Sequence, residues 1–377
     1  MNQKRITSID FAKATCIFLV VLGHVLRDGL FFSFLVPASV PVFFVLAGMT
    51  SKCTVSKDFL KKKARTILIP YLFTASISII IFMLLGSFVS KKLGTSASYS
   101  DFMSSLWLTI YGSSKNGGLR FNRSLWFLPC LFMIFILDLF LEVLTLLFQK
   151  TAKNKTLVIS RILYSLIICL TGNYIITHFP KLFFPFQLET AMCHLPFFEF
   201  GACIKTLILD EIKKDTTTSD KINLCFKLYK KICPKKIVMF LYAITLFSVG
   251  TVLCVTNGIT SSRTDEYGNY ILFFLCSCFF AISFLLFGNT FSNITAFWNY
   301  VGRNTLQILC WNKFPIIMMQ TLITPLGKAL KNTDSIKTLA ICIIPSIITL
   351  FICLIIGEIQ KKILPITLGI TKKSGHQ

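Results

Sequence analysis

Apolar runs about as long as a membrane is thick recur along this chain of 377 residues, separated by segments rich in lysine and arginine. A helix needs about 20 apolar residues to cross the hydrocarbon core of a bilayer. Inside that core the backbone must satisfy its own hydrogen bonds, so only helices and closed barrels can span it. The charged fraction is 15%, well below the roughly 25% of soluble domains. The sequence therefore predicts an all-α, polytopic integral membrane protein.

We expect about ten transmembrane helices in a single integral membrane domain over residues 1–377. The expected helices cover residues 10–27, 35–51, 66–89, 124–148, 157–177, 188–209, 237–257, 270–288, 297–323 and 338–358. These helices lie within about 10–358, and residues 359–377 form a basic tail. The second expected helix contains Pro37 and Pro41, so we expect it to be broken or to enter the membrane at an angle.

Basic residues gather on alternate loops, which sets the expected orientation in the membrane. Residues 52–65 and the loop 210–236 are rich in lysine, whereas the long loop 90–123 carries only scattered cations. Because cytoplasmic loops carry an excess of lysine and arginine, we expect both termini and both lysine-rich segments in the cytoplasm. The net charge of +23 is then assigned to loops that flank the lipid bilayer, and we expect no binding to nucleic acid.

The sequence offers no pattern for a metal site or a tightly bound cofactor. Fourteen cysteines form no C-x-x-C pair and mostly lie in apolar runs, so we interpret them as packing residues. Phosphate-binding loops, dinucleotide-binding glycine patterns and hydrolase nucleophile motifs do not occur. We therefore expect neither a metal nor a tightly bound cofactor.

Two ionisable residues stand out in the first apolar run, because Lys13 and His24 lie eleven positions apart. On a helix they would be roughly 16 Å apart along the axis and on nearly the same face. Ionisable groups inside a membrane span are costly and are functional candidates by default. Such a pair suits a site that takes an acyl group from a soluble carrier at one end and delivers it at the other. The alternatives are a packing role for His24 and an i,i+3 ion pair between Lys13 and Asp10.

Five short segments follow one another in a family-specific order. They are RITSIDFAK to VVLGH (5–24), PVFFVLAG (41–48), KKARTILIPY (62–71), SLWFL (124–128) and VGRNTLQIL (301–309). Together they resemble the membrane O-acyltransferases of acyltransferase family 3, and most closely the branch described as fucose 4-O-acetylase-like. The resemblance extends over the whole chain.

The resemblance implies a membrane O-acetyltransferase in a bacterial cell membrane. It implies that an acetyl group passes from cytoplasmic acetyl-CoA to a sugar hydroxyl of a surface polysaccharide or of its lipid-linked precursor. The implied roles are a catalytic set of Asp10, Lys13 and His24, donor contacts from Lys62, Arg65 and Arg303, and acceptor contacts from Trp126 and Arg123. Interfacial anchoring is the alternative role for Trp126, and positive-inside anchoring is the alternative for the basic run.

Three positions depart from the family pattern. Ser39 and Asn312 stand where the family branch often has histidine, and Ala47 stands where it often has serine. These departures leave open a catalytically silent relative, and a multi-pass transporter or flippase of a glycolipid or small polar solute is the other rival. His194 and Glu199, five positions apart, are a further candidate pair for a proton relay.

Overall fold

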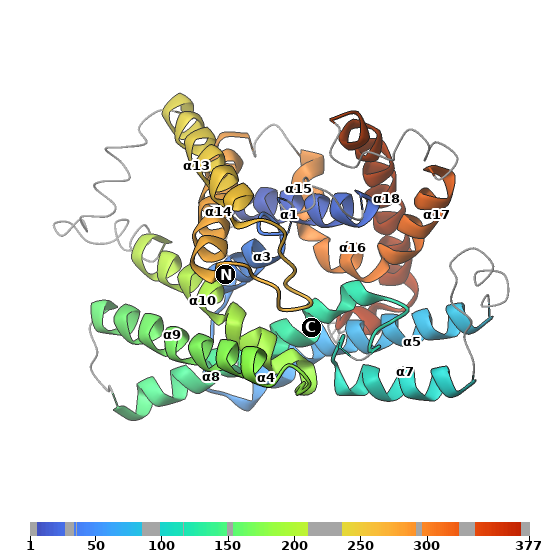
Figure 1. Cartoon of the computed structure of the whole chain (residues 1–377), viewed down its shortest axis with the longest axis horizontal. Helices are drawn as coiled ribbons and strands as arrows, with labels where there is room; N and C mark the ends of the chain where they lie inside the picture. The colour runs from blue at the N-terminus through green and yellow to red at the C-terminus, as the bar shows by residue number, and fades with distance from the viewer. Residues whose placement is uncertain are drawn as a thin grey trace, which may run out of the picture.

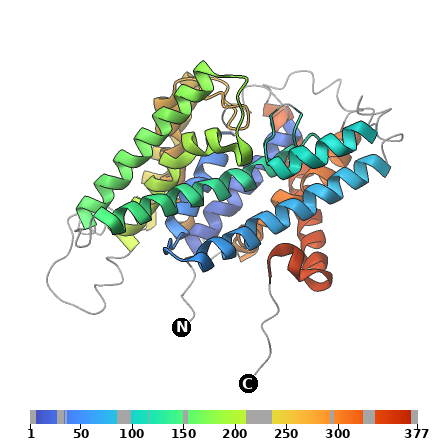
Figure 2. The same ribbon diagram turned by 90° about the horizontal axis from the view of Figure 1, so that it is seen from below.

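The computed structural model describes residues 6–26, 34, 36–84, 99–115, 117–148, 154–209, 236–291, 296–323 and 336–370. These residues form helices joined by short connections, and the β-pairing found among them is an isolated bridge between Ser261 and Glu266. Figures 1 and 2 show the helices gathered into one bundle around α1 (Thr7–Leu26). The all-α prediction is thus confirmed over the described ranges.

Seven helical segments within the described ranges are long and apolar enough to cross a membrane. They are α1, Lys57–Leu84 (α4 Lys57–Lys63, η1 Ala64–Leu68 and α5 Ile69–Leu84), Arg123–Leu147 (η2 Arg123–Trp126 and most of α8 Phe127–Phe148), and segments of α9 (Asn154–His178), α13 (Lys236–Asn257), α14 (Tyr270–Phe291) and α18 (Ile336–Ile363). Each overlaps one of the helices expected from the sequence, although the helix expected over 66–89 begins already at Lys57, within the lysine-rich segment. Their lengths and composition are those of a membrane protein.

The single helix expected over 297–323 is replaced by three shorter ones. They are α15 (Ala296–Arg303), α16 (Thr305–Trp311) and α17 (Lys313–Ile323). Figure 1 shows α15 and α16 running in different directions, and the backbone between them at Asn304 is not helical, with φ −111° and ψ 18°. The Asn304 side-chain amide donates to the Tyr300 carbonyl at 2.9 Å, a local bond that competes with continuation of the helix.

Two other expected helices are not among the seven segments. The range 35–51 contains α3 (Val40–Thr50), which has 11 residues and is too short to span by itself. The range 188–209 is helical throughout, because α10 (Leu188–Ile204) continues into the π-helical turn η4 (Lys205–Leu209). The count of ten spanning helices stays a prediction.

The long loop expected over 90–123 contains a helix of 13 residues, α7 (Tyr99–Tyr111), which packs along α5. The expectation of a loop is therefore wrong for this part, because the neighbouring helix gives its apolar side chains a partner. The lysine-rich loop 210–236 lies outside the described residues up to Lys236, as does the tail from residue 371.

The end of the described chain lies beside the start of the Lys57–Leu84 segment. Helix α18 runs on to Ile363, so the tail expected from residue 359 begins inside a helix. The short turn η6 (Pro365–Leu368) follows, and the backbone of Gly369 packs against that of Arg65. The cytoplasmic position of both termini stays a prediction.

Two helix crossings are closed by glycines that belong to the family-like segments. A Cβ atom at Gly48 would overlap the Phe198 carbonyl oxygen where α3 crosses α10. A Cβ atom at Gly302 would overlap the Asp10 carbonyl oxygen where α15 crosses α1. Small residues let helix backbones approach closely in a membrane, so these glycines fix where α3 and α15 lie.

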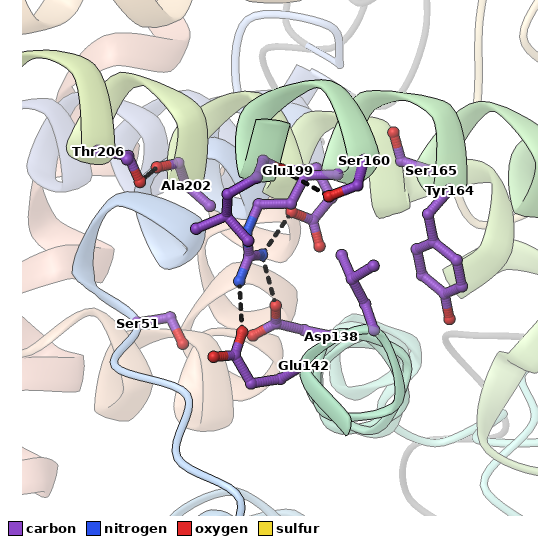
Figure 3. A network of polar contacts seen from close by, with 12 residues as sticks. Ser51, Asp138, Glu142, Ser160, Tyr164, Ser165, Glu199, Ala202 and Thr206 are labelled. Atoms are coloured by element: carbon purple, nitrogen blue, oxygen red, sulfur yellow. Dashed lines mark hydrogen bonds and ion pairs between the residues drawn. The ribbon is translucent and has the colours of Figure 1, made fainter. Parts of the chain in front are cut away.

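A buried ion network ties α8, α9 and α10 together (Figure 3). The guanidinium of Arg161 on α9 donates to Asp138 at 2.9 Å, to Glu142 at 2.9 Å and to Glu199 at 2.7 Å. Asp138 and Glu142 lie on α8, and Glu199 lies on α10. The side chains of Arg161, Asp138 and Glu199 are 9% exposed or less, so the network is a fixed part of the interior.

Candidate active site

A cavity of about 920 Å³ lies between α1, α3, η1, α8, α16 and α17, and the loop 258–269 forms part of its wall. Lys13 and His24 both line it, as the spacing on α1 predicts. Two groups roughly 16 Å apart along one helix thus line the same cavity. Trp126 and Arg123 also line it, so four of the eight predicted site residues meet here.

Two lysines mark one end of the cavity. Lys13 on α1 and Lys63 at the end of α4 both line it, and their charges are close enough to interact. The Lys63 ammonium lies 3.5 Å from the centroid of the Phe135 ring, a cation–π contact that holds the charge against the wall. The basic run that includes Lys63 was expected near the donor, but Lys62 and Arg65 were chosen from it, because the order of basic residues in KKKAR does not show which one faces inward.

The other residues expected at the donor entrance lie outside the lining. Lys62 is exposed, and the Arg65 Nε is buried without a hydrogen-bond partner among the described residues. The Arg303 side chain is 44% exposed, and its Nε lies 4.0 Å from the Asp10 carboxylate across the α1–α15 crossing. Asp10 therefore faces the helix that carries Arg303.

His24 lies at the opposite end of the cavity. Its Nε2 is 3.2 Å from the Ser124 hydroxyl, and the Gln320 side-chain amide donates to its backbone carbonyl at 2.8 Å. Protein surrounds His24, yet its side chain keeps accessible surface because it faces the cavity. The Ser124 hydroxyl contacts one ring nitrogen of His24, which leaves the other for a group bound in the cavity.

Trp126 is 7% exposed and forms part of the cavity wall near His24. It comes from η2, the short 3-10 turn that opens the α8 span and also carries Ser124. Burial in the wall favours a ligand-binding or packing role for Trp126 over the alternative of a lipid-facing interfacial anchor.

The wall between the two ends is apolar. Aromatic and aliphatic side chains line it, among them Ile17, Val20, Phe43, Phe127 and Leu131. A passage with charged ends and an apolar middle suits a ligand with a polar head and a long, weakly polar arm.

The loop 258–269 brings charge to the His24 end that the sequence did not predict there. Arg263 lines the cavity, and Lys313 at the start of α17 lines it as well. Burial lowers the pKa of Arg263 below its usual range, and the neighbouring charge of Arg123 lowers it further. Arg263 was missed because only the folded loop carries it to the first helix, and Lys313 because the break of 297–323 into three helices was not expected.

His194 and Glu199 lie in separate surroundings. His194 is fully buried, with its Nδ1 2.9 Å from the Thr190 carbonyl oxygen and its ring beside Phe44 and Tyr267. Glu199 is bound to Arg161, as described above. The contacts of the two residues do not join them into a relay among the described residues.

The two departures from the family pattern differ in position. Ser39 lines the cavity, and its hydroxyl donates to the Val36 carbonyl at 3.2 Å. Asn312 is fully buried between α16 and α17, outside the lining, and its side-chain amide has no hydrogen-bond partner among the described residues. No group of three or more His, Cys, Asp or Glu residues suited to a metal ion occurs in the described ranges.

Comparison with known proteins places this geometry in a family. Neither the curated proteins nor the solved structures gave a match to the chain. The family model of acyltransferase family 3, described as an acyltransferase domain, matches residues 6–358. That range includes all seven membrane-length segments except the last turns of α18, together with both ends of the cavity. The chain therefore belongs to acyltransferase family 3 and is a membrane acyltransferase.

Proposed function

We propose that the protein is an O-acetyltransferase that moves an acetyl group from acetyl-CoA to a sugar hydroxyl. The acceptor belongs to a surface polysaccharide or to its lipid-linked precursor, and the protein works in the cell membrane. The proposal rests on one observation, the single cavity that contains Lys13 and Lys63 at one end and His24 at the other.

Lys13 and Lys63 bind the phosphates of acetyl-CoA at their end of the cavity. Phosphates bind well to lysine ammonium groups, and two such groups line this end. The apolar middle receives the pantetheine arm, which brings the thioester to His24. Lys62, Arg65 and Arg303, which lie outside the lining, attract the anionic donor toward the entrance through their charge.

His24 acts as the general base at the other end. Its Nδ1, the ring nitrogen that does not contact Ser124, takes the proton of the acceptor hydroxyl while that oxygen attacks the thioester carbonyl. The new C–O ester bond forms, the C–S bond breaks, and the thiolate of CoA takes the proton from His24. Ser124 holds the imidazole through the 3.2 Å contact, and Trp126 forms a face for the sugar ring.

The test is transfer of label from acetyl-CoA in membranes that contain the protein. Wild type should transfer acetate to a glycan acceptor, and His24→Gln should lower the rate by about 10²-fold or more, because positioned general-base catalysis contributes about 10²–10⁴. Glutamine keeps hydrogen bonding but cannot cycle a proton, so a monodisperse His24→Gln protein separates chemistry from folding.

Two outcomes would count against the proposal. If His24→Gln keeps most of the wild-type rate, His24 is a structural residue. If wild type neither hydrolyses acetyl-CoA nor transfers its acetyl group, the result favours a catalytically silent relative or a transporter. A flux assay with a labelled glycolipid in proteoliposomes then distinguishes those two.

A further inference from the structure

Three cations surround the His24 end of the cavity. Arg123, Arg263 and Lys313 line it, and the charges of Arg263 and Lys313 act on His24. Arg123 and Arg263 are close enough to repel each other. Glu266, beside Arg263, is the one carboxylate among the described residues of the lining. The end that receives the acceptor is therefore strongly positive, which a neutral sugar alone would not compensate.

Two buried hydroxyls lie at the same end. Thr260 and Ser262 line the cavity and are 0% and 2% exposed. Neither side-chain oxygen has a hydrogen-bond partner among the described residues. Buried polar groups are almost always hydrogen-bonded, so these hydroxyls are unsatisfied donors beside Arg263, with their oxygens closed off from the cavity.

The loop that carries these groups is held in place by a buried polar hub. Asp265 contacts Lys115 at 2.5 Å, Thr190 at 2.7 Å and the Tyr267 hydroxyl at 2.8 Å. Lys115 also contacts the fully buried Glu189 at 2.9 Å. Burial disfavours the charged form of Lys115, but these two carboxylates outweigh it and raise the pKa of Lys115. Arg263 thus lies on a loop that these contacts hold in place.

The phosphates of the donor do not account for these three cations. The thioester must reach His24, so the nucleotide lies one pantetheine arm away, at the Lys13 and Lys63 end. Roughly 16 Å along α1 separates the two ends. Stabilising the oxyanion of the transition state would need one of the cations and not all three.

We infer that the acceptor sugar is linked to a diphosphate, which Arg123, Arg263 and Lys313 bind while the hydroxyl faces His24. This inference rests on the proposed function and narrows its acceptor class. The planar fork of arginine matches phosphate oxygens in a bidentate manner, and Lys313 adds a third positive charge at the same end. The diphosphate comes from a lipid-linked or from a soluble glycosyl diphosphate.

The test measures anion binding without any transfer step. The full-length protein is placed in nanodiscs of zwitterionic lipid with saturating CoA, which occupies the donor end. Inorganic pyrophosphate and geranyl diphosphate are titrated by calorimetry. Both should bind, and Arg123→Gln and Arg263→Gln should each raise Kd at least about tenfold, the loss expected for one charge-assisted contact. Tighter binding of geranyl diphosphate assigns a lipid-linked source, and equal binding assigns a soluble one.

Two matched variants distinguish binding of diphosphate at these arginines from a general effect of positive charge. Arg120 precedes the same turn outside the cavity lining, 5.3 Å from the Phe121 ring, so Arg120→Gln should bind like wild type. Arg263→Lys keeps the charge without the fork and should recover binding in part, which excludes misfolding as the cause of the loss.

The inference is overturned if neither probe binds at millimolar concentration. It is also overturned if binding falls in Lys63→Gln and not in the arginine variants. Failure of the proposed function looks different, because acetyl transfer would then be absent while arginine-dependent diphosphate binding persists.

Discussion

In the proposed mechanism, Lys63 and His24 act at opposite ends of the cavity. Lys63 is half-buried, with its ammonium on the Phe135 ring, whereas the preceding Lys61 and Lys62 are exposed. The proposed division assigns recognition of the donor to the lysine end and proton transfer to His24. Substitutions at the two ends should therefore change different kinetic constants.

Replacement of Lys63 by methionine should raise the KM for acetyl-CoA with little change in the acceptor KM. Loss of a charge-assisted contact costs about 1.5–3 kcal/mol, or roughly ten- to a hundredfold in KM when KM reports binding. Methionine keeps the apolar contact with Phe135, so the fold should persist. Steady-state kinetics with labelled acetyl-CoA checks this.

The control for that substitution is Lys61→Met, in the same basic run but exposed. It should leave the donor KM near the wild-type value. Equal effects of the two variants would mean that the run acts through its total charge and that Lys63 has no place in the cavity chemistry.

Among the helices, the Arg161 network fixes α8, α9 and α10 relative to one another. The close approach at Gly48 fixes α3 against α10. A buried arginine that contacts three carboxylates is costly to assemble and more costly to break. Lys63 lies near this network, since the Asp138 charge acts on it. The network thus positions the wall against which the proposed donor binds.

Replacement of Arg161 by methionine should lower the free energy of unfolding by about 3–5 kcal/mol, because it leaves buried carboxylates without their counter-ion. Denaturation of the detergent-solubilised protein measures this. Adding Asp138→Asn and Glu199→Gln to the same chain should recover part of the loss, since neutral amides need no counter-ion.

The exposed Lys181 provides the matched control. Lys181→Met should stay within about 0.5 kcal/mol of wild type, as surface substitutions usually do. Stability of Arg161→Met equal to that of Lys181→Met would show that the network contributes nothing to the fold.

For the whole molecule, the proposed function requires the two cavity ends to meet different compartments. The proposed donor is cytoplasmic acetyl-CoA, so the Lys63 end should face the cytoplasm and the Arg263 end the outside. Cysteine introduced at Lys61 should react with a membrane-impermeant maleimide only after permeabilisation, whereas cysteine at Lys181 should react in intact cells. Twelve native cysteines in the described part of the chain are buried or partly buried, and the unmodified chain measures their background.

The reverse labelling pattern would overturn the orientation read from the lysine-rich segments. Labelling of both positions from outside would overturn the model of one continuous path from donor to acceptor.

The sequence alone determined the features that depend on local chain geometry. Apolar runs longer than a bilayer core predicted seven segments that the structure contains, because a helix satisfies its backbone hydrogen bonds within itself. The eleven-residue spacing of Lys13 and His24 placed both on one face of α1, because helical rise and twist are constant. The order of motifs led to the family that the whole-chain match then showed.

Only the tertiary structure decided which residues meet across the chain. It turned Lys63 rather than Lys62 into the cavity, broke 297–323 at Asn304, and carried Arg263 to His24 on a loop held by Asp265. It also explains why glycine stands at positions 48 and 302, since each lies where two helix backbones cross too closely for a Cβ atom. Such outcomes depend on packing between segments far apart in sequence, which no local pattern of residues encodes.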